Sequence, residues 1–268
     1  MSHSDLYVEV DRSAYTNALA ESSPITKTFF ALSALFLCVS ALSARAFIVP
    51  IILFIICTSL TLGIAKVKPH LYLDMYAYPT LMIILSCTII ALFFGVGEPL
   101  TQINLQWTTW TIYKNGVTMA INIFLSVMGS LSCLFFLVLT TSITDLSLLL
   151  RRVHIPTVLI ELSILIYRYI FMFMEISHTM TTAQKLRLGG NSWLKKIREV
   201  SLLAGNLFIR TLEQGERTFV AMNARGYDGN IYALEEFPKP KKTMLAAIIL
   251  FDVLIVAVIF LTLNSGVI

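Results

Sequence analysis

The chain has 268 residues, of which 57% are hydrophobic and only 13% are charged, with a formal net charge of +4 and a mean hydropathy of +0.79. Soluble domains carry about 25% charged residues. The composition therefore excludes an ordinary soluble domain and indicates a protein embedded in lipid.

Apolar runs long enough to cross a bilayer recur along the chain. A spanning helix needs about 20 mostly apolar residues, because the hydrocarbon is roughly 30 Å thick. Unpaired peptide groups are so costly in lipid that such runs must be helical. We predict five spans, at residues 28–43, 46–65, 77–97, 117–141 and 243–263.

A sixth apolar run, residues 155–174, differs from the others because charged side chains interrupt it. Glu161, Arg168 and Glu175 are spaced seven residues apart and fall on one face of a helix. A lipid-exposed span would not carry that stripe. We expect this face to meet polar or charged partners, either inside a helix bundle or at the membrane–cytosol boundary. The helical pattern then continues to Gly189.

Basic residues are concentrated in one part of the chain. Residues 142–242 hold 14 of the 20 Lys and Arg residues, against nine Asp and Glu. The positive-inside rule places this region in the cytosol. With four spans before it and one after, the N-terminus is predicted to be cytosolic and the C-terminus external. The predicted domains are 1–141 with the first four spans, 142–242 as a cytosolic region, and 243–268 as the last span.

The cytosolic region is expected to contain a second long amphipathic helix at residues 192–225, ended by Gly226. The loop at 98–116 is predicted to lie outside, where Trp107 and Trp110 suit the interfacial aromatic belt. The predicted fold class is thus an all-α membrane protein with about five transmembrane helices and a cytosolic region of long amphipathic helices.

Motifs of catalysis or nucleotide binding do not occur in the sequence. There is no GxxxxGK[ST] loop for phosphates, no HExxH and no spacing typical of metal ligands. We expect no catalytic, cofactor-binding or metal-binding residue in this chain. If the protein moves a solute uphill, the energy must therefore come from a partner or an ion gradient. Four cysteines lie within apolar runs and are predicted to be small buried side chains: Cys38, Cys57, Cys87 and Cys133.

Two arginines occupy matching places near the ends of the two predicted cytosolic helices. Arg187 lies near the end of the first and Arg225 near the end of the second. One interpretation is local, since a cation near a helix C-terminus is stabilised by about 0.3–1 kcal/mol. The other is that the two guanidinium forks bind the same kind of acidic or carbonyl-lined groove on two copies of a partner. The flanking residues of these two candidate sites are Leu186, Leu188, Ala224 and Gly226.

One acid lies near the middle of the last predicted span. Asp252 is costly in hydrocarbon unless it is hydrogen-bonded. It is interpreted either as a polar contact, within the bundle or with a membrane partner, or as a hydrogen-bonded interior acid with a structural role only.

Several segments resemble one family of transport proteins. The run Ala-Met-Asn-Ala-Arg-Gly-Tyr-Asp-Gly at 221–229 is similar to the second signature of the transmembrane (T) components of energy-coupling-factor (ECF) importers, in the CbiQ branch. The segment at 183–189 stands where that family has its first signature, but it departs from Ala-Arg-Gly by having leucine on both sides of the arginine. Further similarity lies at 11–17, 24–27 and 161–169, in the order expected of the family.

This resemblance implies that the chain connects other subunits and catalyses no reaction itself. A T component connects a substrate-binding S component in the membrane with two cytosolic ABC ATPase subunits, and its arginine-tipped coupling helices dock on the ATPases. ATP and Mg²⁺ would be bound by those partners, and a CbiM-like S component would hold cobalt, with nickel left open. The location implied is the inner (cytoplasmic) membrane, and no nucleic-acid partner is expected.

The main alternative is a self-contained secondary transporter or channel. Against it, the sequence has no inverted repeat that we detect and almost no charge inside the predicted spans. A membrane-embedded enzyme is a further alternative, for which no catalytic constellation is present.

Overall fold

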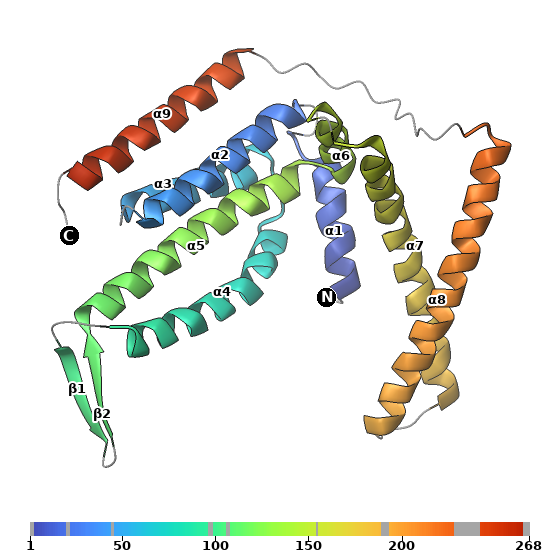
Figure 1. Ribbon diagram of the computed structural model, residues 1–268, viewed down its shortest axis with the longest axis horizontal. Coiled ribbons are helices and arrows are strands. Elements are labelled where there is room, and N and C mark those ends of the chain that lie inside the picture. The colour runs from blue at the N-terminus through green and yellow to red at the C-terminus, as the bar shows by residue number, and fades with distance from the viewer. Residues whose placement is uncertain are drawn as a thin grey trace. The chain divides into compact units, whose positions relative to one another are not determined.

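The computed structural model describes residues 3–19, 22–43, 46–95, 99–105, 108–153, 155–188, 193–227 and 242–264 (Figure 1). The chain divides into two compact units, described separately below.

The bundle unit comprises Met1–Ser142 and Phe237–Ile268, and the hairpin unit comprises Ile143–Glu236. The bundle unit contains α1 (His3–Thr16), α2 (Pro24–Ser43), α3 (Ile48–Ser59), the π-helical turn η1 (Leu60–Ile64), α4 (Pro69–Phe93), β1 (Pro99–Leu105), β2 (Thr108–Tyr113), α5 (Lys114–Thr140) and α9 (Lys242–Asn264). The hairpin unit contains α6 (Ile143–Arg152), α7 (Thr157–Leu188) and α8 (Trp193–Ala224).

Five helices of the described chain are long and apolar enough to cross a membrane, namely α2, α4, α5, α9 and, within α7, Thr157–Gln184. The predicted fold class, an all-α membrane protein with about five such helices, is confirmed, apart from the short pair of strands β1 and β2. The sides of the membrane on which the termini lie stay a prediction.

The five candidate helices differ from the five predicted spans in two respects. The run at 46–65 was expected to be a full span, but the twelve residues of α3 and the five of η1 form a helix shorter than the other candidates. This helix ends because Lys66 adopts a left-handed backbone conformation, with φ 54°. Conversely, α7 qualifies by length and composition although charged residues interrupt it.

The core of the bundle unit forms around α5, which contacts α1, α2, α3 and α4. On α2, the small residues Ala31, Ala34, Cys38 and Ala41 recur every three or four positions and are buried. Small residues let helix backbones approach closely, and this is how helices associate within lipid. The prediction for the cysteines is confirmed, since all four are free and buried.

Gly129 of α5 marks the closest of these approaches. A Cβ at this position would lie 2.9 Å from the Pro50 carbonyl oxygen and 3.0 Å from the Cys38 Sγ. We expect Gly129→Ala to lower the free energy of unfolding by about 1–3 kcal/mol, because a packed interior tolerates no added methyl group. Thermal unfolding in detergent measures this loss. Gly63→Ala is the matched control, since a Cβ there would meet nothing within 4 Å; equal melting temperatures for the two variants would contradict the expectation.

The C-terminal end of α5 is capped by side chains from the start of the chain. Lys27 is 5% exposed, and its Nζ donates hydrogen bonds to the main-chain oxygens of Thr140 at 2.7 Å and Leu19 at 3.1 Å. Asn17 Nδ2 donates to the Leu139 oxygen at 3.1 Å. The last carbonyls of a helix lack partners within it, and a cation there also offsets the helix dipole.

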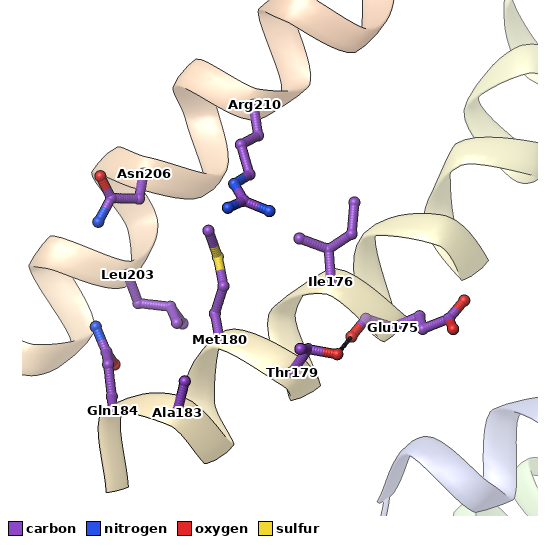
Figure 2. Close-up of a pocket in the computed structure, with 9 residues that line it drawn as sticks. All are labelled: Glu175, Ile176, Thr179, Met180, Ala183, Gln184, Leu203, Asn206 and Arg210. Carbon is purple, nitrogen blue, oxygen red and sulfur yellow. Dashed lines mark hydrogen bonds between the residues drawn. The ribbon is translucent and has the colours of Figure 1, made fainter. Parts of the chain in front are cut away.

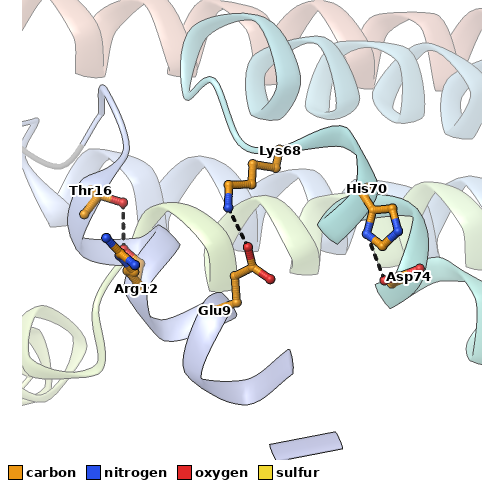
Figure 3. Close-up of polar contacts among 6 residues, drawn as sticks. All are labelled: Glu9, Arg12, Thr16, Lys68, His70 and Asp74. Atoms are coloured by element: carbon orange, nitrogen blue, oxygen red, sulfur yellow. Dashed lines mark hydrogen bonds and ion pairs between the residues drawn. The ribbon is translucent and has the colours of Figure 1, made fainter. Parts of the chain in front are cut away.

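The helix α1 was not predicted, because its sequence is polar and its contacts are with residues far away in the sequence. Besides the capping contacts, an ion pair of 2.7 Å between Glu9 and Lys68 joins α1 to the residue that precedes α4 (Figure 3). This pair is exposed on its lysine side and contributes at most about 1 kcal/mol.

The prediction of a loop at 98–116 is wrong, because much of this segment forms strands. Here β1 and β2 pair in an antiparallel two-stranded sheet. The β2 sequence, Thr-Thr-Trp-Thr-Ile-Tyr, is rich in β-branched and aromatic residues, which favour strands. Trp107 lies outside the described residues, and the interfacial belt stays a prediction.

Asp252 takes part in a polar contact inside the bundle unit. Ser33 of α2 donates a hydrogen bond from Oγ to the Asp252 Oδ1 at 3.2 Å, which connects α9 to α2. A contact of Asp252 with a membrane partner stays a prediction.

Candidate functional site: the α7–α8 hairpin

The hairpin unit is dominated by two antiparallel helices, α7 and α8, each of 32 residues (Figure 1). At about 1.5 Å per residue, each is about 48 Å long. The prediction of one helix reaching to Gly189 and a second at 192–225 is confirmed for the described residues. Gly189 and Gly190, predicted to end the first helix, and Asn191 or Ser192, predicted to cap the second, lie outside the described residues.

Hydrogen bonds join the two helices near both ends. Near the turn, Gln184 Nε2 of α7 donates to the main-chain oxygen of Glu199 at 3.3 Å. At the other end, the Tyr227 hydroxyl donates to Glu161 Oε2 at 3.0 Å. The Glu161 side chain is only 8% exposed. These bonds fix the register of α8 along α7.

Gly226 ends α8 as predicted, with φ +81°. The Gly226 N–H donates to the Asn223 oxygen at 3.0 Å, and the Tyr227 N–H donates to the Met222 oxygen at 3.1 Å. This pair of bonds is a Schellman motif, which requires a left-handed residue that glycine adopts without strain. The reversal of the chain brings the Tyr227 hydroxyl back to Glu161. Arg225, one residue before the glycine, is therefore held at a fixed helix end.

The structure places Arg187 and Arg225 at opposite ends of the hairpin rather than together. Arg187 is in the last turn of α7, and Arg225 follows the last residue of α8. The length of α8, about 48 Å, separates them. Leu186 is 84% exposed, whereas the side chains of Arg187 and Leu188 lie outside the described part.

The stripe of charges on α7 faces α8, but its members have different surroundings. Glu161 is buried against Tyr227, as described above. Arg168 is exposed and lines a groove between the helices. Glu175 is also exposed and lines a second groove of about 470 Å³, where its carboxylate points away from Arg210 (Figure 2).

Sequence reasoning missed Arg210, Arg217 and Tyr227. The two arginines lie seven residues apart on α8, the same spacing as the charged stripe on α7, and both line grooves that face α7. That seven-residue spacing is visible in the sequence and could have identified the two arginines as candidates. Tyr227 stood within the segment at 221–229, but its partner 66 positions earlier in the chain was not apparent.

Comparisons with known proteins extend over both units. Residues 21–234 match the family model CbiQ, described as cobalt transport protein. The chain belongs to this family. The CbiQ match contains both candidate arginines.

The chain is also similar to individual proteins, and two of the three described here carry cobalt-transport names. An uncharacterized protein of Methanocaldococcus jannaschii is 35% identical over 253 residues, which cover 94% of this chain and 93% of that protein. A putative fused cobalt transport protein CbiMQ of Methanocorpusculum labreanum is 33% identical over 92% of this chain and 41% of its own length. The cobalt transport protein CbiQ of Rhodobacter capsulatus is 32% identical over 44% of this chain and 48% of its own. As a CbiQ-family member, the chain is a multi-pass membrane component of cobalt transport.

The hydrogen bond from Tyr227 to Glu161 predicts a measurable effect. Tyr227→Phe removes one donor from a buried carboxylate, and we expect the free energy of unfolding to fall by about 1.5–3 kcal/mol. The control is Tyr169→Phe, because Tyr169 stacks on Phe173 and its ring is retained. Thermal unfolding and amide exchange at residues 222–227 give the comparison. Equal stability and exchange for the two variants would show that the bond does not hold the end of α8.

Proposed function

We propose that the chain is the energy-coupling transmembrane subunit of an ECF-type ABC importer for cobalt. In this role it joins two cytosolic ABC ATPase subunits to an S component that binds the metal. Membership of the CbiQ family supports the cobalt part of the proposal. The relative named as a fused CbiMQ supports a CbiM-like protein as the S component.

The observation that carries the proposal is the hairpin with an arginine at each end. Two ATPase subunits require two contact points, and Arg187 and Arg225 are about 48 Å apart. A guanidinium makes paired, charge-assisted hydrogen bonds with carboxylates, so each arginine suits an acidic groove. Ala224 and Gly226 flank one contact, and Leu186 and Leu188 flank the other.

In the proposed cycle, ATP and Mg²⁺ bind to the ATPases, and closure of the ATPase pair displaces the two ends of the hairpin. The bonds at Glu161 and Gln184 make α7 and α8 move together instead of sliding. The displacement passes through the chain connections at Ser142–Ile143 and Glu236–Phe237, which join the two units. The bundle unit then shifts the S component, which releases cobalt into the cytosol. The proposed location is the inner membrane, with a cytosolic N-terminus.

Reconstitution tests this proposal. Proteoliposomes that hold the chain, the ATPases and the S component should take up cobalt only when ATP is supplied on the ATPase side. Omission of this chain should abolish uptake while ATP hydrolysis by the ATPases persists. Cobalt uptake by the chain alone would contradict the proposal and favour a self-contained carrier.

A further inference from the structure

A groove of about 500 Å³ lies between the half of α7 that precedes Met172 and the last third of α8. It is distinct from the groove of Figure 2, which lies nearer the turn of the hairpin. We call it the arginine groove, because Arg168 of α7 and Arg217 and Arg225 of the α8 end all line it.

All the charged side chains that line the arginine groove are positive. No acidic residue lines the groove, and within the described ranges none of its three arginines takes part in an ion pair. Three guanidinium groups that share one groove repel each other, and an anion between them converts the repulsion into attraction. The groove therefore favours an anionic occupant.

The remaining lining indicates what kind of anion. Ile164, Leu165 and Met172 contribute apolar side chains from α7, and Met222 contributes one from the α8 side. A small hydrophilic anion would leave these side chains in contact with water, whereas an amphiphile would cover them. The occupant thus needs an anionic head and an apolar tail.

The helix that forms one wall supports the same conclusion. The groove residues of α7 belong to the apolar stretch Thr157–Gln184. Docking of both hairpin ends on cytosolic ATPases would place this stretch along the membrane surface rather than across the membrane. On the same stretch, Leu162, Ile166 and Ile170 are about half exposed. Such a surface suits contact with acyl chains, and basic grooves beside apolar helices are sites where anionic lipid headgroups bind.

We propose that the arginine groove binds an anionic membrane phospholipid, with its phosphodiester between the guanidiniums of Arg168 and Arg217 and part of an acyl chain on the apolar wall. An acidic segment of a protein partner fits less well, because it would not cover the apolar wall. Arg225 lines this groove and is also the proposed ATPase contact, so the test leaves Arg225 and Arg187 unchanged and varies only Arg168 and Arg217.

The test uses the full chain in nanodiscs of equal parts phosphatidylcholine and phosphatidylglycerol. After mild detergent extraction, mass spectrometry measures the ratio of the two lipids that remain bound. Wild type should be enriched in phosphatidylglycerol. Basic residues near a membrane surface contribute about 1 kcal/mol each, or about fivefold, so enrichment should fall about fivefold in Arg217→Gln and about 25-fold in Arg168→Gln/Arg217→Gln. Arg210→Gln, in the other groove, is the matched control and should keep the wild-type ratio.

Four results would overturn the inference. The first is no enrichment in wild type, and the second is equal loss in the Arg210→Gln control. The third is displacement of the lipid by excess inorganic phosphate, which would identify a site for free anions. If the double variant kept its lipid but lost ATPase binding, the occupant would be an acidic protein segment, and the lipid assignment would be wrong.

Discussion

Replacing both Arg187 and Arg225 with alanine is expected to release the ATPase subunits from the chain in mild detergent and to abolish ATP-dependent cobalt uptake. Truncating one partner of a desolvated, hydrogen-bonded charge pair costs about 2–5 kcal/mol, mostly through faster dissociation. Each single variant should keep one contact and retain ATPase weakly, but either should stop transport because coupling requires both ends. Pull-down and uptake of the two single variants and the double variant measure these effects.

Lysine variants separate docking from local helix stabilisation. Lysine keeps the charge but lacks the planar fork, so Arg187→Lys and Arg225→Lys should also be impaired if the arginines bind a partner. A role limited to the helix dipole predicts a loss of at most about 1 kcal/mol, rescue by lysine and unchanged ATPase binding. Normal ATPase retention in the double alanine variant would eliminate the docking role.

A large loss of stability is expected from Lys27→Met in the bundle unit. The substitution keeps the apolar stem but removes the ammonium that donates to the Thr140 and Leu19 oxygens. Hydrogen bonds from charged groups contribute about 1.5–3 kcal/mol each, so the free energy of unfolding should fall by about 3–5 kcal/mol. The control is Lys68→Met, which removes an exposed ion pair and should cost at most about 1 kcal/mol. If the two variants melted at the same temperature in detergent, the capping role of Lys27 would be refuted.

The parts of the fold that were predictable are those that local sequence determines. Apolar runs of about 20 residues located α2, α5 and α9, because lipid demands helices of that length and composition. Helical periodicity and Gly226 located the hairpin helices to within a few residues. The small buried cysteines followed from their apolar neighbours.

The parts that were not predictable depend on contacts between distant residues. The helix α1 packs on α5, and Ser13 reaches the Leu139 oxygen across 126 positions of sequence. Hydropathy gives no sign of such a helix, because α1 is polar. The early end of the run at 46–65 depends on the backbone conformation of Lys66, which no local pattern indicates.

The candidate site shows the same division. The sequence located Arg187 and Arg225 at helix ends, but only the antiparallel arrangement of α7 and α8 separates them along the hairpin. The charged stripe was seen correctly as one helix face, whereas the burial of Glu161 against Tyr227 and the exposure of Arg168 depend on packing within the hairpin unit. Within the described part of the chain, no three His, Cys, Asp or Glu side chains are placed to hold a metal ion. That cobalt is bound by another subunit stays a proposal.

The most direct test of the coupling role is to isolate the wild-type chain from its native membrane in mild detergent and identify the proteins bound to it. The account predicts ABC ATPase subunits and a membrane protein of the CbiM type, with the ATPases lost from the Arg187→Ala/Arg225→Ala variant. A chain that is isolated without an ATPase, and that takes up cobalt alone in proteoliposomes, would contradict it.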